Sequence, residues 1–304
     1  MRFLIFIYGK SRMKRTQLVS GKRAECHILL PKDDFSLERT VFLQFKNISG
    51  EWFIKETDCC HLKTEELKQH VAHIRENIVR MVANANSGHP GGSLSAADIL
   101  TVLYFEVMDI NEDNVKGIDR DRFVLSKGHA SPLLYATLFE KGLLKEDLNT
   151  FRKINSKLQG HPNMNYVDGV DMSTGSLGQG ISAAVGMALA NKVDGNDHRV
   201  YTLLGDGECE EGEVWEAAMF AAHYHLDNLC AIVDFNGLQI DGDVRDVIDP
   251  TPIDQKFEAF GWHVISIDGH DFEAIAQACA HAKACKNQPT MILAHTIKGK
   301  GVSF

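Results

Sequence analysis

The chain has 304 residues, of which 44% are apolar and 24% charged, a composition typical of globular proteins that argues against disordered, collagen-like and disulfide-scaffold classes. The first 60 residues hold 11 Lys and Arg against 7 Asp and Glu, whereas the remainder holds 21 against 34 and is therefore acidic. This balance argues against nucleic-acid binding, and no stretch approaches the ~18 apolar residues of a membrane span. Seven cysteines without a CxxC motif, and no signal-peptide pattern, predict a cytoplasmic protein.

Residues 1–60 form a compositional block of their own. Apolar residues alternate at Val41, Leu43 and Phe45, which predicts a small β-rich appendage. The alternative is a poorly ordered extension, upstream sequence that an unusual start site adds to the chain. No chemical motif falls in this block, so the function is expected to reside in a second domain, residues 61–304.

From residue 64 the pattern changes to that of helices. The apolar residues that share the first helical face recur at spacings of four and three: Leu67, Val71, Ile74, Ile78 and Met81. Residues 95–98 resemble a capping box that opens a second helix. Further helices are predicted over residues 130–139, 181–190, 213–225 and 272–284.

Short apolar runs predict buried strands over residues 123–125, 199–204, 229–233, 263–267 and 290–294. A helix separates the second strand from the third, and another separates the fourth from the fifth, so these pairs form βαβ units with parallel strands. The predicted fold class is α/β, a doubly wound and mostly parallel sheet with helices on both faces. Ligands bind to such folds where the strands end.

The loop after the strand at 199–204 contains three glycines and four carboxylates. Its glycine spacing does not match a dinucleotide fingerprint. A helix N-terminus attracts an anion by only ~0.3–1 kcal/mol, and the repulsion between these carboxylates and a diphosphate would be larger. A diphosphate could therefore bind here only with a cation between it and the carboxylates. Asp206 lies in this loop, and Asn236 follows the next strand 30 residues later. Their spacing predicts a shared Mg²⁺ or Ca²⁺ site, although either residue alone is more typical of a turn or a cap.

Two further features are candidates for binding and chemistry. His89, His129 and His161 each lie in a glycine-flanked loop, and together they would offer imidazoles for proton transfer and hydrogen bonding. A zinc site is the alternative, although the sequence shows no typical zinc-ligand spacing. The glycine-rich segment 173–180 would let a flat ring approach the backbone, with Leu177 as an apolar contact; the alternative is a tight loop that serves helix packing.

Four motifs in this order resemble transketolase: SGHPGG at 87–92, LSKGHA at 125–130, TGSLGQG at 174–180, and GDG at 205–207 followed by Asn236. The resemblance covers residues 64–304 and is closest to the N-terminal subunit of split transketolases. It implies thiamine diphosphate bound through a divalent metal, Mg²⁺ or Ca²⁺.

The resemblance also implies roles for individual residues. The metal ligands would be Asp206, Asn236 and the carbonyl of Leu238. Contacts to the diphosphate would come from His129 and Gly207. The residues that line the thiazolium ring would be Gly175, Leu177 and Ile240. Those that face a sugar phosphate substrate would be His89, His129 and His161. Glu211 would lie where two symmetry-related cofactor sites meet.

The resemblance further implies a partner chain, because the catalytic glutamate of this family belongs to a pyrimidine-binding domain for which the chain leaves no room. A heterotetramer with that C-terminal subunit is expected. An active-site histidine that the family carries after residues 297–301 is missing, so the domain is expected to be truncated at its C-terminus. Two alternatives are the α subunit of a thiamine-dependent 2-oxo acid dehydrogenase and an inactive cofactor- or partner-binding remnant.

Overall fold

The computed structural model describes residues 12–20, 23–29, 38–48, 51–240 and 242–303, with side chains from residue 64 onward. The chain divides into two compact units, Met1–Lys68 and Gln69–Phe304. The boundary between them falls inside the helix α1 (Cys59–Ala85). All residues with an expected chemical role belong to the second unit.

The backbone of the first unit forms a four-stranded antiparallel sheet in the order β1-β2-β3-β4. The strands are β1 (Arg12–Ser20), β2 (Arg23–Leu29), β3 (Glu38–Ile48) and β4 (Glu51–Asp58). The register of β1 against β2 shifts at two points, as at a β-bulge.

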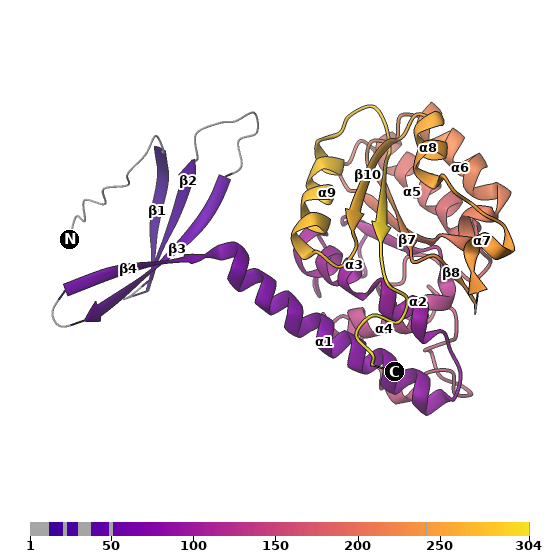
Figure 1. Cartoon of the computed structure of the whole chain (residues 1–304), viewed down its shortest axis with the longest axis horizontal. Helices are drawn as coiled ribbons and strands as arrows, with labels where there is room; N and C mark the ends of the chain where they lie inside the picture. Colours follow the sequence, from indigo (N-terminus) through magenta and orange to yellow (C-terminus); the bar gives the residue numbers. More distant parts are fainter. Residues whose placement is uncertain (1–11, 21–22, 30–37, 49–50, 241, 304) are drawn as a thin grey trace. The chain divides into compact units, whose positions relative to one another are not determined.

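A five-stranded parallel sheet forms the centre of the second unit (Figure 1). From one edge to the other, its strands are β10 (His263–Asp268), β11 (Thr290–His295), β7 (Leu229–Phe235), β6 (Val200–Gly205) and β5 (Arg122–Leu125). The strand predictions are confirmed to within two residues at each end. Because strands covered on both faces are continuous apolar runs, the sequence signals them strongly.

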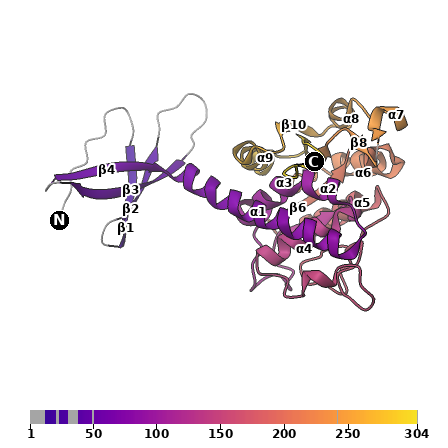
Figure 2. The same ribbon diagram turned by 60° about the horizontal axis from the view of Figure 1, so that its bottom comes forward.

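Helices cover both faces of this sheet. On one face lie α5 (Gln179–Asp194), α6 (Gly212–His223) and α8 (Ile253–Ala259); on the other lie α3 (Ala97–Val102) and α9 (Phe272–Ala284). Ala231 and Val233 of β7 belong to the core shared with α5, α6 and α8. The alternate residues Cys230 and Ile232 are buried on the opposite face. Figure 2 likewise shows α8 and α9 on opposite sides of β10.

The part of α1 that belongs to the second unit runs beside α4 (Ser131–Glu140), as Figure 2 shows. There the Nδ1 atoms of His70 and His73 lie 2.9 and 3.0 Å from Oε1 of Glu140. The apolar face predicted from the sequence is buried, including Ile74 and Ile78.

The capping box predicted at residues 95–98 is wrong. Ser95 ends a short helix, α2 (Pro90–Ser95), and the N-cap of α3 is Ala96, which makes no side-chain cap. The Ser95 hydroxyl donates instead to Oδ2 of Asp234 at 2.5 Å. The Asp98 carboxylate accepts from Nη2 of Arg75 at 2.6 Å. Two side chains expected to cap a helix therefore make tertiary contacts.

Short elements begin after one or two intervening residues beyond the ends of three of the strands. η2 (Gly128–Ala130) follows β5, η4 (Gly207–Glu210) follows β6, and β8 (Leu238–Gln239) follows β7. The others are η1 (Leu103–Val107, a π-helix), η3 (Leu148–Thr150), β9 (Gly242–Asp243, antiparallel to β8) and α7 (Val244–Val247). Within the described ranges, no helix is both long and apolar enough to cross a membrane.

Candidate cofactor and substrate site

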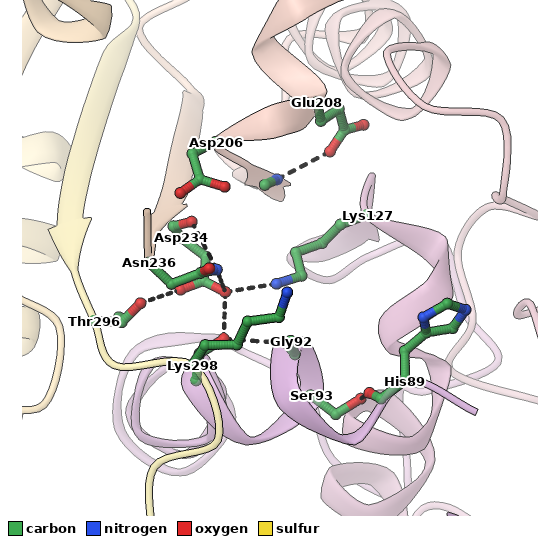
Figure 3. A network of polar contacts seen from close by, with 12 residues as sticks. His89, Gly92, Ser93, Lys127, Asp206, Glu208, Asp234, Asn236, Thr296 and Lys298 are labelled. Carbon is green, nitrogen blue, oxygen red and sulfur yellow. Dashed lines mark hydrogen bonds and ion pairs between the residues drawn. The ribbon is translucent and has the colours of Figure 1, made fainter. Parts of the chain in front are cut away.

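Asp206 and Asn236 lie side by side at the carboxyl ends of two neighbouring strands (Figure 3). β6 and β7 are parallel, and their register pairs Gly205 with Asp234. The Asp206 carboxylate reaches across to the second strand end, where the backbone N–H of Gly237 donates to its Oδ2 at 2.6 Å. The juxtaposition expected from the sequence is therefore present, although the metal itself stays a prediction.

The buried position of Asp206 favours the binding of a cation to its carboxylate. The residue is 3% exposed, and its burial raises the pKa of the carboxyl. Backbone N–H groups of Gly237 and Gly207 oppose this rise, the second at 2.8 Å from Oδ1. Because burial penalises an isolated carboxylate, a bound cation would relieve the cost.

The other two expected metal ligands also present oxygen atoms. Oδ1 of Asn236 accepts from the backbone N–H of Leu238 at 3.1 Å, and Nδ2 lies 3.3 Å from Oδ2 of Asp234. The Leu238 carbonyl accepts from Nζ of Lys298 at 3.2 Å, and the carbonyl of Ile240 accepts from the same ammonium at 2.6 Å. The Leu238 carbonyl therefore already lies against a positive charge, which the sequence did not predict.

Asp234 connects several strand ends beneath these ligands. Its carboxylate accepts from Nζ of Lys127 at 2.5 Å, from the Ser95 hydroxyl and from the Thr296 hydroxyl (Figure 3). Burial would raise its pKa, but the Lys127 charge and these hydrogen bonds outweigh burial and lower it. Asp234 was not among the site residues predicted from the sequence. An acidic residue inside the otherwise apolar strand LCAIVDF was the available signal.

Glu208 plays a similar connecting role and was also missed. Its Oε1 accepts from the Ser126 hydroxyl at 2.6 Å and from the Gly178 N–H at 2.9 Å, and its Oε2 accepts from the Gly205 N–H at 3.0 Å. This buried carboxyl therefore joins the ends of β5 and β6 to the glycine-rich segment before α5. Its pKa is raised by burial.

The three candidate histidines lie together at the carboxyl ends of the strands, on the same side of the sheet as Asp206. The ring centroids of His89 and His129 are 5.2 Å apart. His161 lies against the glycine-rich segment, because a Cβ added at Gly175 would be 3.0 Å from its Cγ. A Cβ added at Gly128 would in turn be 2.6 Å from the backbone nitrogen of Gly175. The expected convergence is therefore found.

All three imidazoles favour the neutral form. Burial, followed by the charge of Lys127, lowers the pKa of His129 to about 3. Burial and the Arg152 charge lower the pKa of both His89 and His161. A neutral imidazole both donates and accepts a hydrogen bond, which suits contact with sugar hydroxyl groups.

The remaining candidate residues surround this region. Gly207 packs against Gln239, since an added Cβ would lie 3.1 Å from its Cδ. Leu177 is partly buried, whereas Ile240 is 81% exposed. Glu211 is exposed and directly precedes α6. In the part of the chain with described side chains, no three His, Cys, Asp or Glu are grouped as metal ligands, so the zinc alternative finds no ligand set there.

Comparisons with known proteins agree on one family. Residues 67–304 match the model described as transketolase, thiamine diphosphate binding domain. The chain is 48% identical over 238 residues to a 6-deoxy-6-sulfo-D-fructose transketolase subunit of Clostridium sp. and 41% identical over 244 residues to an apulose-4-phosphate transketolase subunit of Phocaeicola vulgatus. These matches cover 78% and 80% of this chain and 86% of each relative.

Longer proteins of the same family match over a smaller share of their length. Human transketolase is 45% identical over 250 residues, which cover 79% of this chain and 38% of the human protein. The solved structure of a transketolase from Leishmania mexicana superposes with a TM-score of 0.73 at 38% identity, over 78% of this chain and 37% of that one.

Proposed function

Since the chain belongs to the transketolase family and contains its thiamine diphosphate-binding domain, we propose that it is one subunit of a two-chain transketolase. The observation that carries this proposal is the similarity to two relatives that are themselves named as transketolase subunits. The match covers 86% of the length of each relative. The reaction is the transfer of a two-carbon ketol unit from a ketose to an aldose. The family assignment favours this reaction over that of a 2-oxo acid dehydrogenase.

The residues at the ends of β6 and β7 would hold the cofactor through a divalent metal, Mg²⁺ or Ca²⁺. Asp206, Asn236 and the Leu238 carbonyl supply three oxygen atoms from two adjacent loops, which is the ligand chemistry such ions require. The ammonium of Lys298 beside them matches the negative charge of a diphosphate. Contacts to the diphosphate come from Gly207 and His129, and contacts to the thiazolium come from Gly175, Leu177 and Ile240.

Thiamine diphosphate supplies the nucleophilic carbon and the electron sink that the cleavage of a carbon–carbon bond requires. The protein's own contribution is to orient the substrate. His89, His129 and His161 present neutral imidazoles that hydrogen-bond sugar hydroxyls and move protons to and from them. The names of the two relatives contain a sulfo sugar and a sugar phosphate, so the substrates proposed here are sugars with an anionic end group.

A partner chain completes the active enzyme. It provides the pyrimidine-binding domain and its catalytic glutamate, and the assembly is a heterotetramer in which Glu211 lies near the contact between cofactor sites. The four cysteines with described side chains form no disulfide, which supports a location in the reducing cytoplasm.

The test mixes this chain with its candidate pyrimidine-binding partner, thiamine diphosphate, Mg²⁺ and a ketose–aldose pair, and measures two-carbon transfer by mass spectrometry. We expect transfer that requires both chains and is lost on addition of EDTA. A complex of two folded chains that binds the cofactor without transfer would instead identify an inactive remnant. Release of CO₂ from pyruvate would identify the dehydrogenase reaction.

A further inference from the structure

Arg152 has a backbone conformation that is rare for a long side chain. Its φ is +60°, in the left-handed region, which costs roughly 1–2 kcal/mol for a residue other than glycine. The backbone N–H of Arg152 donates to the carbonyl of Leu158 at 2.9 Å, so the strained residue closes the loop that leads to His161. Strain of this kind persists only where the surrounding structure fixes it.

The side chain of Arg152 lies between two loops that carry candidate histidines. Its Nη1 donates to the hydroxyl of Ser87 at 2.7 Å, two residues before His89. A Cβ added at Gly160 would be only 2.8–2.9 Å from the guanidinium, which therefore packs directly on the backbone preceding His161. The Phe151 ring lies 5.6 Å from the guanidinium carbon.

The hydrogen bonds of this guanidinium are incomplete. Nε is buried and has no hydrogen-bond partner among the residues that the structure describes. Leaving a buried donor unpaired costs free energy, so the position of the group is not explained by its own hydrogen bonds alone. Its charge, which arginine retains at every physiological pH, lowers the pKa of both imidazoles.

We infer that Arg152 is a positioning residue that fixes the loops of His89 and His161 relative to each other and keeps a permanent positive charge beside both imidazoles. Both rings then stay available as neutral hydrogen-bonding groups. The significance for the substrate rests on the proposed function, whereas the effect on the histidines does not.

The electrostatic surroundings of the two rings support this role. His89 faces the charges of Arg152 and Lys298 and the rings of His129 and His161. After burial, Arg152 is the largest cause of its lowered pKa. For His161, Arg152 is the cause named after burial. Arg152 is thus the charged side chain that acts on both histidines.

The test follows the ring resonances of ¹³C-labelled histidines by NMR during a pH titration of the full chain, assigned with His89→Asn and His161→Asn. In Arg152→Gln, which removes the charge, we expect the titration midpoints of both rings to move to higher pH. Arg152→Lys should keep them low. Lys153→Gln removes an exposed charge one residue away and is the matched control, with midpoints equal to those of the wild type.

Unchanged midpoints in a folded Arg152→Gln variant would overturn the inference, as would equal shifts in the Lys153→Gln control. If Arg152→Gln does not fold, Ser87→Ala replaces it, because this change removes only the hydroxyl that holds Nη1. The titration midpoint of His89 is then expected at higher pH. An unchanged His89 midpoint in Ser87→Ala would count against the inference. Because these titrations need neither cofactor nor partner, they are independent of the proposed function. In the two-chain enzyme, the acid limb of the kcat/KM profile should move to higher pH in Arg152→Gln.

Discussion

At the scale of single residues, the stability of the protein depends on the buried ion pair of Lys127 and Asp234, which lies next to Asn236. The two side chains are 1% and 0% exposed. Removing one partner of such a pair leaves a buried charge without compensation, which costs about 3–5 kcal/mol. We therefore expect Lys127→Met to lower the free energy of unfolding by about that amount, measured by urea denaturation.

The double variant Lys127→Met, Asp234→Asn provides the control. It leaves no buried charge, so it should be more stable than the sum of the two single variants predicts. Additive losses would show that Lys127 stabilises the protein through packing of its aliphatic stem rather than through its charge.

His129 makes stability depend on pH. Its pKa is about 3 in the folded protein, against 6.5 in the unfolded chain, so the unfolded state binds the proton more tightly. The stability contributed by the neutral ring is complete above pH 6.5 and is lost as the pH falls from 6.5 towards 3. Between pH 7.5 and 5.0 this loss amounts to about 2 kcal/mol.

We expect His129→Gln to remove this part of the pH dependence. The free energy of unfolding, measured by urea denaturation at both pH values, should fall by about 2 kcal/mol less in the variant than in the wild type. An identical fall in both proteins would mean that the ring titrates at its ordinary pKa in the folded state.

The sequence predicted the positions of Asp206 and Asn236 but not those of Asp234 and Glu208. The first pair follows apolar strands whose parallel order could be inferred, so their neighbourhood follows from topology. Asp234 lies within a buried strand and depends on Lys127 from a different strand end, a contact that no local pattern encodes. Glu208 is one of four carboxylates in its loop, and its contacts with Ser126 and Gly178, which distinguish it, exist only in the folded structure.

At the scale of elements, the approach of α5 to the end of β5 depends on one glycine. A Cβ at Gly180 would lie 2.5 Å from the Cα of Ser126, and backbone at that distance cannot yield without moving the helix. Gly186 in the same helix has no atom of the described residues within 4 Å of an added Cβ. The two glycines therefore form a matched pair for mutation.

Gly180→Ala should lower the melting temperature and weaken thiamine diphosphate binding, because Ser126 holds Glu208 and with it the end of β6. Gly186→Ala should instead raise the free energy of unfolding by about 0.5–1 kcal/mol, since alanine favours the helix. Circular dichroism melts and calorimetric titration with the cofactor measure both effects. Equal behaviour of the two variants would contradict the close packing at Gly180.

Elements were predicted well where burial is continuous and poorly where side chains have tertiary roles. β5, β6, β7 and β11 are mostly apolar and buried, so composition marks them, whereas the outer strand β10 (HVISID) is marked by the alternation of its apolar residues. α2 begins with Pro90, Gly91 and Gly92, a composition that indicates a turn, and no helix was predicted there. Ser95 and Asp98 fitted a capping box by spacing, but their polar groups are bound to Asp234 and Arg75.

At the scale of the whole molecule, every candidate site residue lies in the unit Gln69–Phe304. A chain that starts at Cys59 keeps the whole of α1 and omits β1–β4. We expect this shortened chain to retain the melting temperature of the second unit and its affinity for thiamine diphosphate, measured by calorimetry. Loss of cofactor binding in a folded shortened chain would assign residues 1–58 a part in the site.

The carboxyl ends of β5, β6 and β7, which carry candidate site residues, all point to one side of the parallel sheet, and the turn that joins α6 to β7 lies at the opposite, amino end of the strands. The turns that lead from a helix into a strand therefore lie away from the candidate site residues, whereas the segments that leave the strands carry them. An epitope or a fluorescent reporter inserted near His225 would accordingly lie away from the candidate site residues, so it could report binding of the proposed partner chain without entering that site.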